Sequence, residues 1–291
     1  MTWWLGLGLP LCAVATLAFC LRAYGSRRWA SSIQGLTHRL EAAKPDGAIH
    51  QDSPTRFRSH ELQDLPAPVQ RYFRAVLQED QRIVSAATID MAGTLNMSTT
   101  SDRWRPFTSR QRVVTRRASF LWDARISMAP GLAARVVDGY IAGEGLLHAA
   151  VLGLFTVARV QGGGEIARGE FMRFFAEAVW YPTALLPSQG VRWEDVDEHS
   201  ANASIADGPL ALTLRFRFND AGLIDSVRAG ERGSMMGDRV VMLPWECSLS
   251  DYQMRQGMRV PITGEAAWIR PEGRKPYFRG TITAVSHEFT M

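Results

Sequence analysis

The chain has 291 residues, of which 21% are charged and 46% hydrophobic, and its formal net charge at pH 7 is +4. This balance is ordinary for a globular protein and argues against a disordered or low-complexity chain. So small a net charge gives little support to nucleic-acid binding, although it suits a surface beside anionic lipid headgroups.

The first element is an apolar segment from Trp3 to Leu21, with no charged residue before Arg22. About nineteen residues, at a rise of about 1.5 Å each, are enough to cross a bilayer core of about 30 Å. The segment lacks the basic start and the small-x-small cleavage site of a signal peptide. It therefore predicts a retained single-pass anchor over residues 1–24, in a bacterial inner membrane.

Nearby charges predict the orientation of this anchor. Arg22, Arg27 and Arg28 follow the apolar segment, and no lysine or arginine precedes it. Because basic residues are enriched on the cytoplasmic side, the large domain is expected in the cytoplasm.

Residues 25–61 are expected to form a juxtamembrane helix and a linker. Helix-forming composition runs over 27–44, and prolines, a glycine and polar groups mark 45–60 as the linker. A second helix is predicted over 65–77, with Pro66 and Pro68 suited to its first turn. Its apolar face comprises Val69, Tyr72, Phe73, Val76 and Leu77.

After Arg82 the hydrophobic period changes to two, which is typical of strands. The predicted strand segments are 84–98, 103–116, 118–128, 133–151, 190–197, 200–206, 209–218, 222–232, 239–252, 259–270 and 276–289. Some ten or eleven strands in sequence favour an antiparallel sheet that is curled or closed. The fold class predicted for residues 62–291 is therefore a single mostly β (α+β) domain, a curved antiparallel half-barrel of about ten strands.

One helix, predicted over 165–181, interrupts the strands, and Pro182 ends it. Its aromatic residues make an apolar face too wide for a solvated helix, so the concave side of the sheet is expected to wrap it. Glu170, Arg173 and Glu177 form a narrow polar stripe on the opposite face.

Several motifs carry a resemblance to a known family. As they stand in this sequence, they are Leu65-Pro66-x-Pro68-Val69-x-Arg71-Tyr72, Asp138-Gly139-Tyr140-x-x-Gly143-x-Gly145, Arg173-Phe174-x-x-Glu177-Ala178-x-Trp180-Tyr181-Pro182-Thr183-Ala184-Leu185-Leu186-Pro187, Pro244-Trp245-Glu246, Tyr252, Gly257-Met258-Arg259-Val260-Pro261 and Glu265-x-x-Trp268. From about residue 62 to the C-terminus, they resemble an uncharacterised bacterial family known as a domain of unknown function. The resemblance implies no activity.

A second, architectural resemblance is to the half-barrel of lipoprotein-localisation factors such as LolA. Those proteins fold a curved antiparallel sheet over helices and hold acyl chains in the concavity. The similarity lies in strand number, inserted apolar helix and membrane anchor, and no LolA motif is present. Such factors work outside the cytoplasm, whereas the arginines after the anchor here predict the inside.

No motif predicts a metal site, a cofactor or an established catalytic centre. The six histidines are scattered, with no pair three or four residues apart. Nucleophile elbows and phosphate-binding loops are absent from the sequence. The densest basic stretch, from Arg103 to Arg117, fits a solvated outer face or contact with anionic lipid better than nucleic acid.

The stripe Glu170, Arg173 and Glu177 is the best candidate site, and it has two interpretations. Buried charges need partners, so the stripe can be a structural ion network. Alternatively, it forms the polar floor of a pocket in which Arg173 binds a carboxylate or phosphate. Asp138, Tyr140 and Arg228 either join this floor or serve as hydrogen-bonding groups at strand ends, and Trp180 either contacts the ligand or belongs to the core.

Three functions follow from these features. The preferred hypothesis is a membrane-anchored, non-enzymatic domain that binds an acyl chain, a lipid or a similar hydrophobic ligand in the concavity. A scaffold for a membrane protein partner is the second. The third is an enzyme acting on a hydrophobic small molecule through Glu177 with Tyr140 or Asp138.

Overall fold

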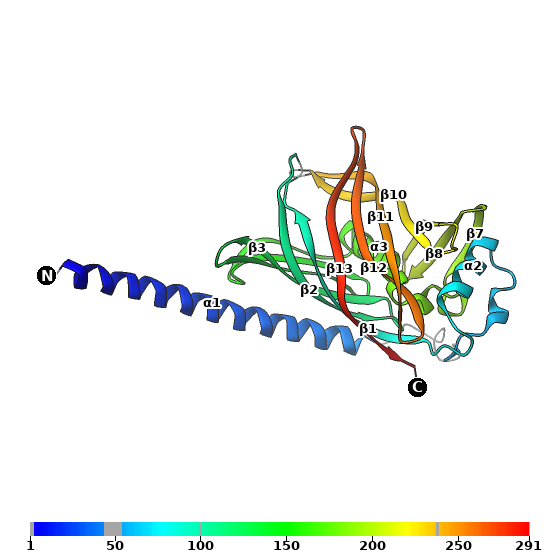
Figure 1. The fold of residues 1–291 in the computed structure, drawn as a ribbon, viewed down its shortest axis with the longest axis horizontal. Coiled ribbons are helices and arrows are strands. Elements are labelled where there is room, and N and C mark those ends of the chain that lie inside the picture. The colour runs from blue at the N-terminus through cyan, green and yellow to red at the C-terminus, as the bar shows by residue number, and fades with distance from the viewer. Residues whose placement is uncertain (1–2, 44–53, 99, 237–238, 291) are drawn as a thin grey trace.

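The computed structural model describes residues 3–43, 54–98, 100–236 and 239–290, with the side chains of 3–15, 18, 235 and 236 left aside. Figure 1 shows one long helix beside a strongly curved sheet. Of the predicted linker over 45–60, residues 45–53 lie outside the described part.

The long helix, α1 (Trp3–Ala42), joins the predicted anchor and the predicted juxtamembrane helix into one element. Among the described residues, no helix is both long and apolar enough to cross a membrane, so the predicted membrane span is not confirmed. The anchor prediction rests on Trp3 to Leu21, and most of those side chains lie outside the described ones.

The C-terminal half of α1 lies against the outer face of the sheet (Figure 1). Trp29 is buried there, and its Nε1 donates a hydrogen bond to Asp123 Oδ1 at 2.8 Å. Nearer the domain's edge, Gly25 meets the turn at Leu152, where a Cβ would approach the Leu152 carbonyl oxygen to 2.2 Å. This close approach requires glycine and fixes where the helix leaves the domain.

The remaining helices are short. They are η2 (Ser59–Leu62), α2 (Ala67–Val76), α3 (Gly164–Ala176), η3 (Glu177–Trp180), η4 (Pro182–Leu185) and η5 (Pro187–Gln189). The apolar face predicted for the second helix is confirmed, because all five of its residues are buried. The inserted helix is also present, although its last turn tightens into a 3-10 helix at Glu177.

In the described part of the chain, thirteen antiparallel strands form one open sheet. They are β1 (Val84–Asn96), β2 (Trp104–Val114), β3 (Ser119–Ala129), β4 (Leu132–Ile141), β5 (Glu144–Val151), β6 (Phe155–Gly162), β7 (Arg192–Asp197), β8 (Ser200–Asp207), β9 (Leu210–Phe218), β10 (Ile224–Met236), β11 (Arg239–Arg255), β12 (Met258–Arg270) and β13 (Gly273–Phe289). Their spatial order is β6-β5-β4-β3-β2-β1-β13-β12-β11-β10-β9-β8-β7.

The predicted class, a mostly β fold with a curved antiparallel sheet around a helix, is confirmed, and the strand count of about ten is corrected to thirteen. The segment 133–151 contains two strands, separated by a tight turn in which Ala142 and Gly143 have positive φ. The other missed strand, β6, lies at one edge and has exposed apolar side chains on much of its length. An edge strand paired on one side lacks the alternation that reveals a half-buried strand.

The sheet buries a different helix on each face. Phe120, Trp122 and Tyr140 point to the concave side, into the main core that surrounds α3. Their neighbours Leu121 and Val137 point to the convex side and pack with α1. Because side chains alternate between the two faces of a strand, β3 and β4 have buried residues on both faces of the sheet.

Candidate functional site

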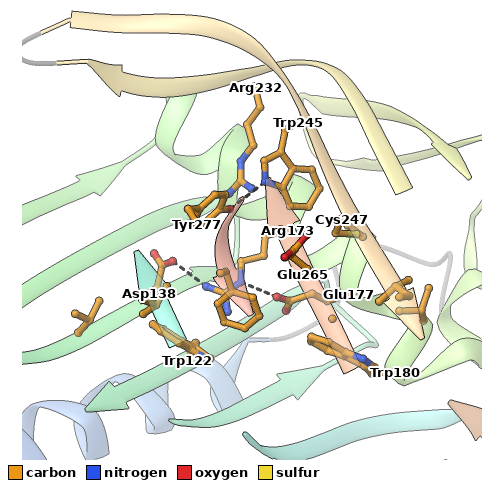
Figure 2. Close-up of a pocket in the computed structure, with 18 of the residues that line it drawn as sticks. Trp122, Asp138, Arg173, Glu177, Trp180, Arg232, Trp245, Cys247, Glu265 and Tyr277 are labelled. Atoms are coloured by element: carbon orange, nitrogen blue, oxygen red, sulfur yellow. Dashed lines mark hydrogen bonds and ion pairs between the residues drawn. The ribbon is translucent and has the colours of Figure 1, made fainter. Parts of the chain in front are cut away.

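A cavity of about 210 Å³ lies between α3, η3 and the concave face of the sheet (Figure 2). Most of its wall is apolar, with aromatic rings from Trp122, Trp180, Trp245, Tyr277 and Phe278. The charged residues of the wall are Asp138, Arg173, Glu177, Arg232 and Glu265. An apolar cavity with a few polar groups is the usual form of a small-molecule site.

Strand register explains how one side of the cavity is assembled. Gln111 of β2 pairs with Trp122 of β3, which pairs in turn with Asp138 of β4. Residues opposite each other in an antiparallel sheet share a face, so all three side chains point into the concavity. Arg173 of α3 lies above them, its guanidinium 4.9 Å from the centre of the Trp122 ring.

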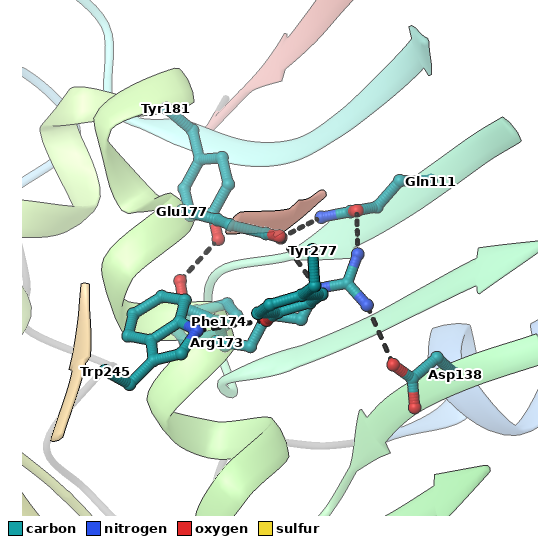
Figure 3. A network of polar contacts seen from close by, with 8 residues as sticks. All are labelled: Gln111, Asp138, Arg173, Phe174, Glu177, Tyr181, Trp245 and Tyr277. Carbon is teal, nitrogen blue, oxygen red and sulfur yellow. Dashed lines mark hydrogen bonds and ion pairs between the residues drawn. The ribbon is translucent and has the colours of Figure 1, made fainter. Parts of the chain in front are cut away.

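Arg173 is fully engaged by neighbouring side chains (Figure 3). Its Nε donates to Glu177 Oε1 at 2.7 Å, its Nη1 to Asp138 Oδ2 at 2.9 Å, and its Nη2 to Gln111 Oε1 at 3.4 Å. Gln111 Nε2 closes the ring with a 2.7 Å hydrogen bond to Glu177 Oε2. Burial opposes the charged form, but the surrounding carboxylates raise the pKa of Arg173 above its usual range.

Glu170 is buried on the same helix but does not line the cavity. Burial, with the Asp138 charge nearby, raises the pKa of its carboxyl well above the usual range. Burial also raises the pKa of Asp138, against the opposing effect of Arg173. We therefore assign Glu170 as the protonated member of the cluster, because Asp138 has a guanidinium partner at 2.9 Å.

The second arginine of the cavity, Arg232, has a different environment. Its guanidinium lies 4.8 Å from the centre of the Trp245 ring and 5.9 Å from that of Trp268. Within the described residues, no hydrogen bond or ion pair to Arg232 is found, and its Nη1 is buried without a partner. Arg232 is thus held by aromatic rings but not neutralised by a direct contact.

The indoles on this side are only partly satisfied. Trp245 Nε1 donates a hydrogen bond to Tyr277 Oη at 3.0 Å. Trp180 lines the opposite side of the cavity, and its buried Nε1 has no partner in the described part of the chain. Figure 2 shows Trp180 and Arg232 on opposite sides of the cavity.

The structure brings together four of the seven predicted site residues around the cavity: Asp138, Arg173, Glu177 and Trp180. Glu170 lies directly behind them. The other two lie elsewhere: Tyr140 stacks on Phe171 and donates to Asp207 Oδ2 at 2.6 Å, and Arg228 is exposed. Neither of these two belongs to the floor predicted for Arg173. Of the two pairs named in the enzyme hypothesis, the cavity therefore combines Glu177 with Asp138 but not with Tyr140.

Sequence reasoning missed Gln111 and Arg232. Gln111 is buried in the midst of an arginine-rich strand that was interpreted as a solvated surface. Arg232 follows a bulge between Ala229 and Arg232, where β10 gains one residue relative to β11. The bulge reverses the alternation, so that Arg228 faces outward and Arg232 faces the cavity. The inward face of β2 comprises Phe107, Ser109, Gln111 and Val113, so two polar residues between apolar ones are the sequence signal that could have indicated Gln111.

Two further chemistries were considered for the cavity. Among the residues that the structure describes, no three His, Cys, Asp or Glu side chains converge on a metal position. Cys247 lines the cavity, but burial raises the pKa of its thiol to about 12. A thiol with so high a pKa is a poor nucleophile at neutral pH.

The protein is a mostly β domain in which a curved, open antiparallel sheet wraps a helix, with an aromatic-lined cavity on the concave side. The chain belongs to the family of unknown function DUF6920, whose model matches residues 63–287. The predicted resemblance to an uncharacterised family is thereby confirmed. No curated protein matches the sequence.

Two solved structures resemble this fold at very low sequence identity. A LolA superfamily protein from Nitrosomonas europaea is 7% identical, with a TM-score of 0.40 over 77% of this chain and 94% of that one. A beta-barrel-like protein of domain of unknown function DUF1849 from Brucella abortus is 9% identical, with a TM-score of 0.26 over 71% and 99%.

Proposed function

We propose that the protein binds a hydrophobic small molecule or acyl chain in the cavity between α3 and the sheet. The observation that carries the proposal is a mostly apolar, aromatic-lined cavity of about 210 Å³ between the helix and the sheet. Protein interiors contain few voids larger than a water molecule, so an apolar cavity of this size costs stability unless it is used.

The size of the cavity limits what enters it. Sites for drug-sized ligands usually measure about 300–1,000 Å³. A cavity below that range suits a compact apolar molecule or one segment of a longer chain, whose remainder lies outside. Both are compatible with a ligand drawn from a membrane.

Quenching of tryptophan fluorescence tests the proposal, because three indoles line the cavity. Full-length protein in phosphatidylcholine nanodiscs would be titrated with 9,10-dibromostearate, whose bromines quench indoles on contact. We expect saturable quenching beyond that of protein-free and non-binding controls. Mass spectrometry of organic extracts of the full-length protein would identify any ligand that is purified with it.

A cavity-filling variant provides the matched control. A Cβ at Gly264 would lie 3.7 Å from Trp180 and 3.8 Å from Leu249, which are ordinary contacts. Gly264→Leu should therefore fold, fill the Trp180 side of the cavity and abolish saturable quenching. Gly35→Leu adds the same side chain at an exposed position of α1 with open space around it, and should bind normally. Equal quenching of wild type and Gly264→Leu would contradict the proposal.

We also propose that the first part of α1 anchors this domain to a bacterial inner membrane, with the large domain in the cytoplasm. The support comes from the apolar run up to Leu21 and from Arg22, Arg27 and Arg28 after it. Extraction of membranes at alkaline pH should leave the full-length protein in the pellet. Protease added to spheroplasts should leave the domain intact. Digestion of the domain would contradict the proposed orientation and place the domain on the outer side of the membrane.

A further inference from the structure

We propose that the ligand is anionic and that Arg232, rather than Arg173, binds its charge. The inference rests on the proposed ligand-binding function and specifies the class of ligand: an apolar body that ends in one carboxylate or phosphodiester. It follows from the unequal partnering of the charged groups around the cavity.

Each carboxylate that lines the cavity already has an arginine partner. Asp138 and Glu177 bind Arg173 at 2.9 and 2.7 Å. Glu265 binds Arg279 at 2.7 Å and is also paired with Arg274. None of these three carboxylates is within ion-pair distance of Arg232.

Glu170 does not supply the missing charge either. Its carboxyl is buried, and no ion pair between it and Arg232 is found among the described residues. Burial also raises the pKa of this carboxyl well above the usual range, which favours its neutral form. The cluster then holds two guanidiniums against Asp138 and Glu177, both of which Arg173 binds. One positive charge, that of Arg232, is left over at the cavity wall.

A guanidinium in this position lowers stability unless its buried N–H groups have hydrogen-bond acceptors. A buried donor left without a partner costs about 1–3 kcal/mol, and more when it is charged. The rings of Trp245 and Trp268 compensate in part through cation–π contact. Stacking occupies the face of a guanidinium and leaves N–H groups at its edge, which match the two oxygens of a carboxylate or phosphate.

The position of Arg232 also suits an amphiphile. The arginine lies on one side of the cavity, and the apolar space extends to Trp180 on the other (Figure 2). A chain in that space would place its terminal anion at Arg232. Because the cavity is small, a long chain would extend beyond it.

The test compares a charged probe with its neutral ester. Full-length protein in phosphatidylcholine nanodiscs would be titrated with 9,10-dibromostearate and with its methyl ester. Since hydrogen bonds to charged groups contribute about 1.5–3 kcal/mol, we expect the acid to bind at least about tenfold more tightly. Equal affinity for acid and ester would overturn the inference and leave the proposed function standing. Failure of both probes to bind would overturn the proposed function itself.

Variants on one strand supply the controls. Arg232→Met should reduce the acid-to-ester ratio to about one, and Arg232→Lys should retain part of it. Arg228→Met removes an exposed arginine four residues earlier on β10 and should leave the ratio unchanged. If Arg232→Met does not fold, the wild-type ratio and the lysine variant decide the question. An unchanged ratio in folded Arg232→Met would assign the anion to another group.

The source of the anion is resolved by a second set of probes. Nanodiscs would contain dibrominated phosphatidylglycerol or dibrominated phosphatidylcholine in place of the fatty acid. Quenching by phosphatidylglycerol alone would identify an anionic phospholipid. Quenching by the fatty acid but by neither phospholipid would identify a free carboxylate.

Discussion

The two arginines of the cavity differ in almost every respect that decides the role of a buried charge. Arg173 is held by two carboxylates and an amide from two strands and its own helix. Arg232 stacks on two indoles and has no hydrogen-bond or ion-pair partner among the described residues. The satisfied arginine is expected to stabilise the fold, and the unsatisfied one is expected to be free for a ligand.

The largest expected effect is on stability when each arginine is replaced by methionine. Arg173→Met leaves Asp138 and Glu177 buried without their partner, and breaking a buried pair in this way costs about 3–5 kcal/mol. Arg232→Met removes a charge without a direct partner, so its effect on the free energy of unfolding should stay within about 1 kcal/mol. Urea unfolding of the ligand-free proteins measures both. Equal losses of stability in the two variants would contradict the distinction between a structural Arg173 and a ligand-binding Arg232.

A second prediction concerns Glu170, which we assign as protonated. Between its usual pKa and its raised pKa, the folded protein holds a proton that the unfolded chain releases. The free energy of unfolding of the wild type should therefore fall as the pH rises above about 4.5, by up to about 1.4 kcal/mol per pH unit.

Glu170→Gln cannot release this proton and should lose that pH dependence. Its stability relative to wild type should rise steadily as the pH is raised from about 5 toward the raised pKa of Glu170. Urea unfolding at several pH values provides the measurement, with exposed Glu194→Gln as the control. A constant difference between wild type and Glu170→Gln would mean that Glu170 is ionised in the folded protein.

The smallest expected effect is at Tyr277, on the Arg232 side of the cavity. Tyr277→Phe removes the acceptor of the Trp245 Nε1 hydrogen bond and should cost about 1 kcal/mol. Because Trp245 also stacks on Arg232, dibromostearate binding should weaken as well. Tyr140→Phe removes a similar hydrogen bond, to Asp207, away from the cavity. In Tyr140→Phe, thermal unfolding should show a comparable loss of stability, and the quenching titration should show normal binding.

Much of the fold was predictable because it depends on local periodicity. The change from helical spacing to a period of two after Arg82 predicted the long run of strands, and the apolar face of 165–181 predicted a helix covered by the sheet. The errors in strand number came from a two-residue turn at Ala142–Gly143 and from an edge strand, β6. Neither feature changes the local pattern enough to reveal a boundary.

By itself, the sequence determined the buried face of the helix over 65–77 and the covering of the helix over 165–181, because burial on a helix follows a side chain's position in a 3.6-residue repeat. It also placed Arg173 and Glu177 together, since they are one helical turn apart. The tertiary structure alone decided the rest of the site. Strand register brought Gln111 and Asp138 beneath Arg173, and a one-residue bulge turned Arg232, rather than Arg228, toward the cavity. Register and bulges depend on pairing between distant segments, which a local repeat does not encode.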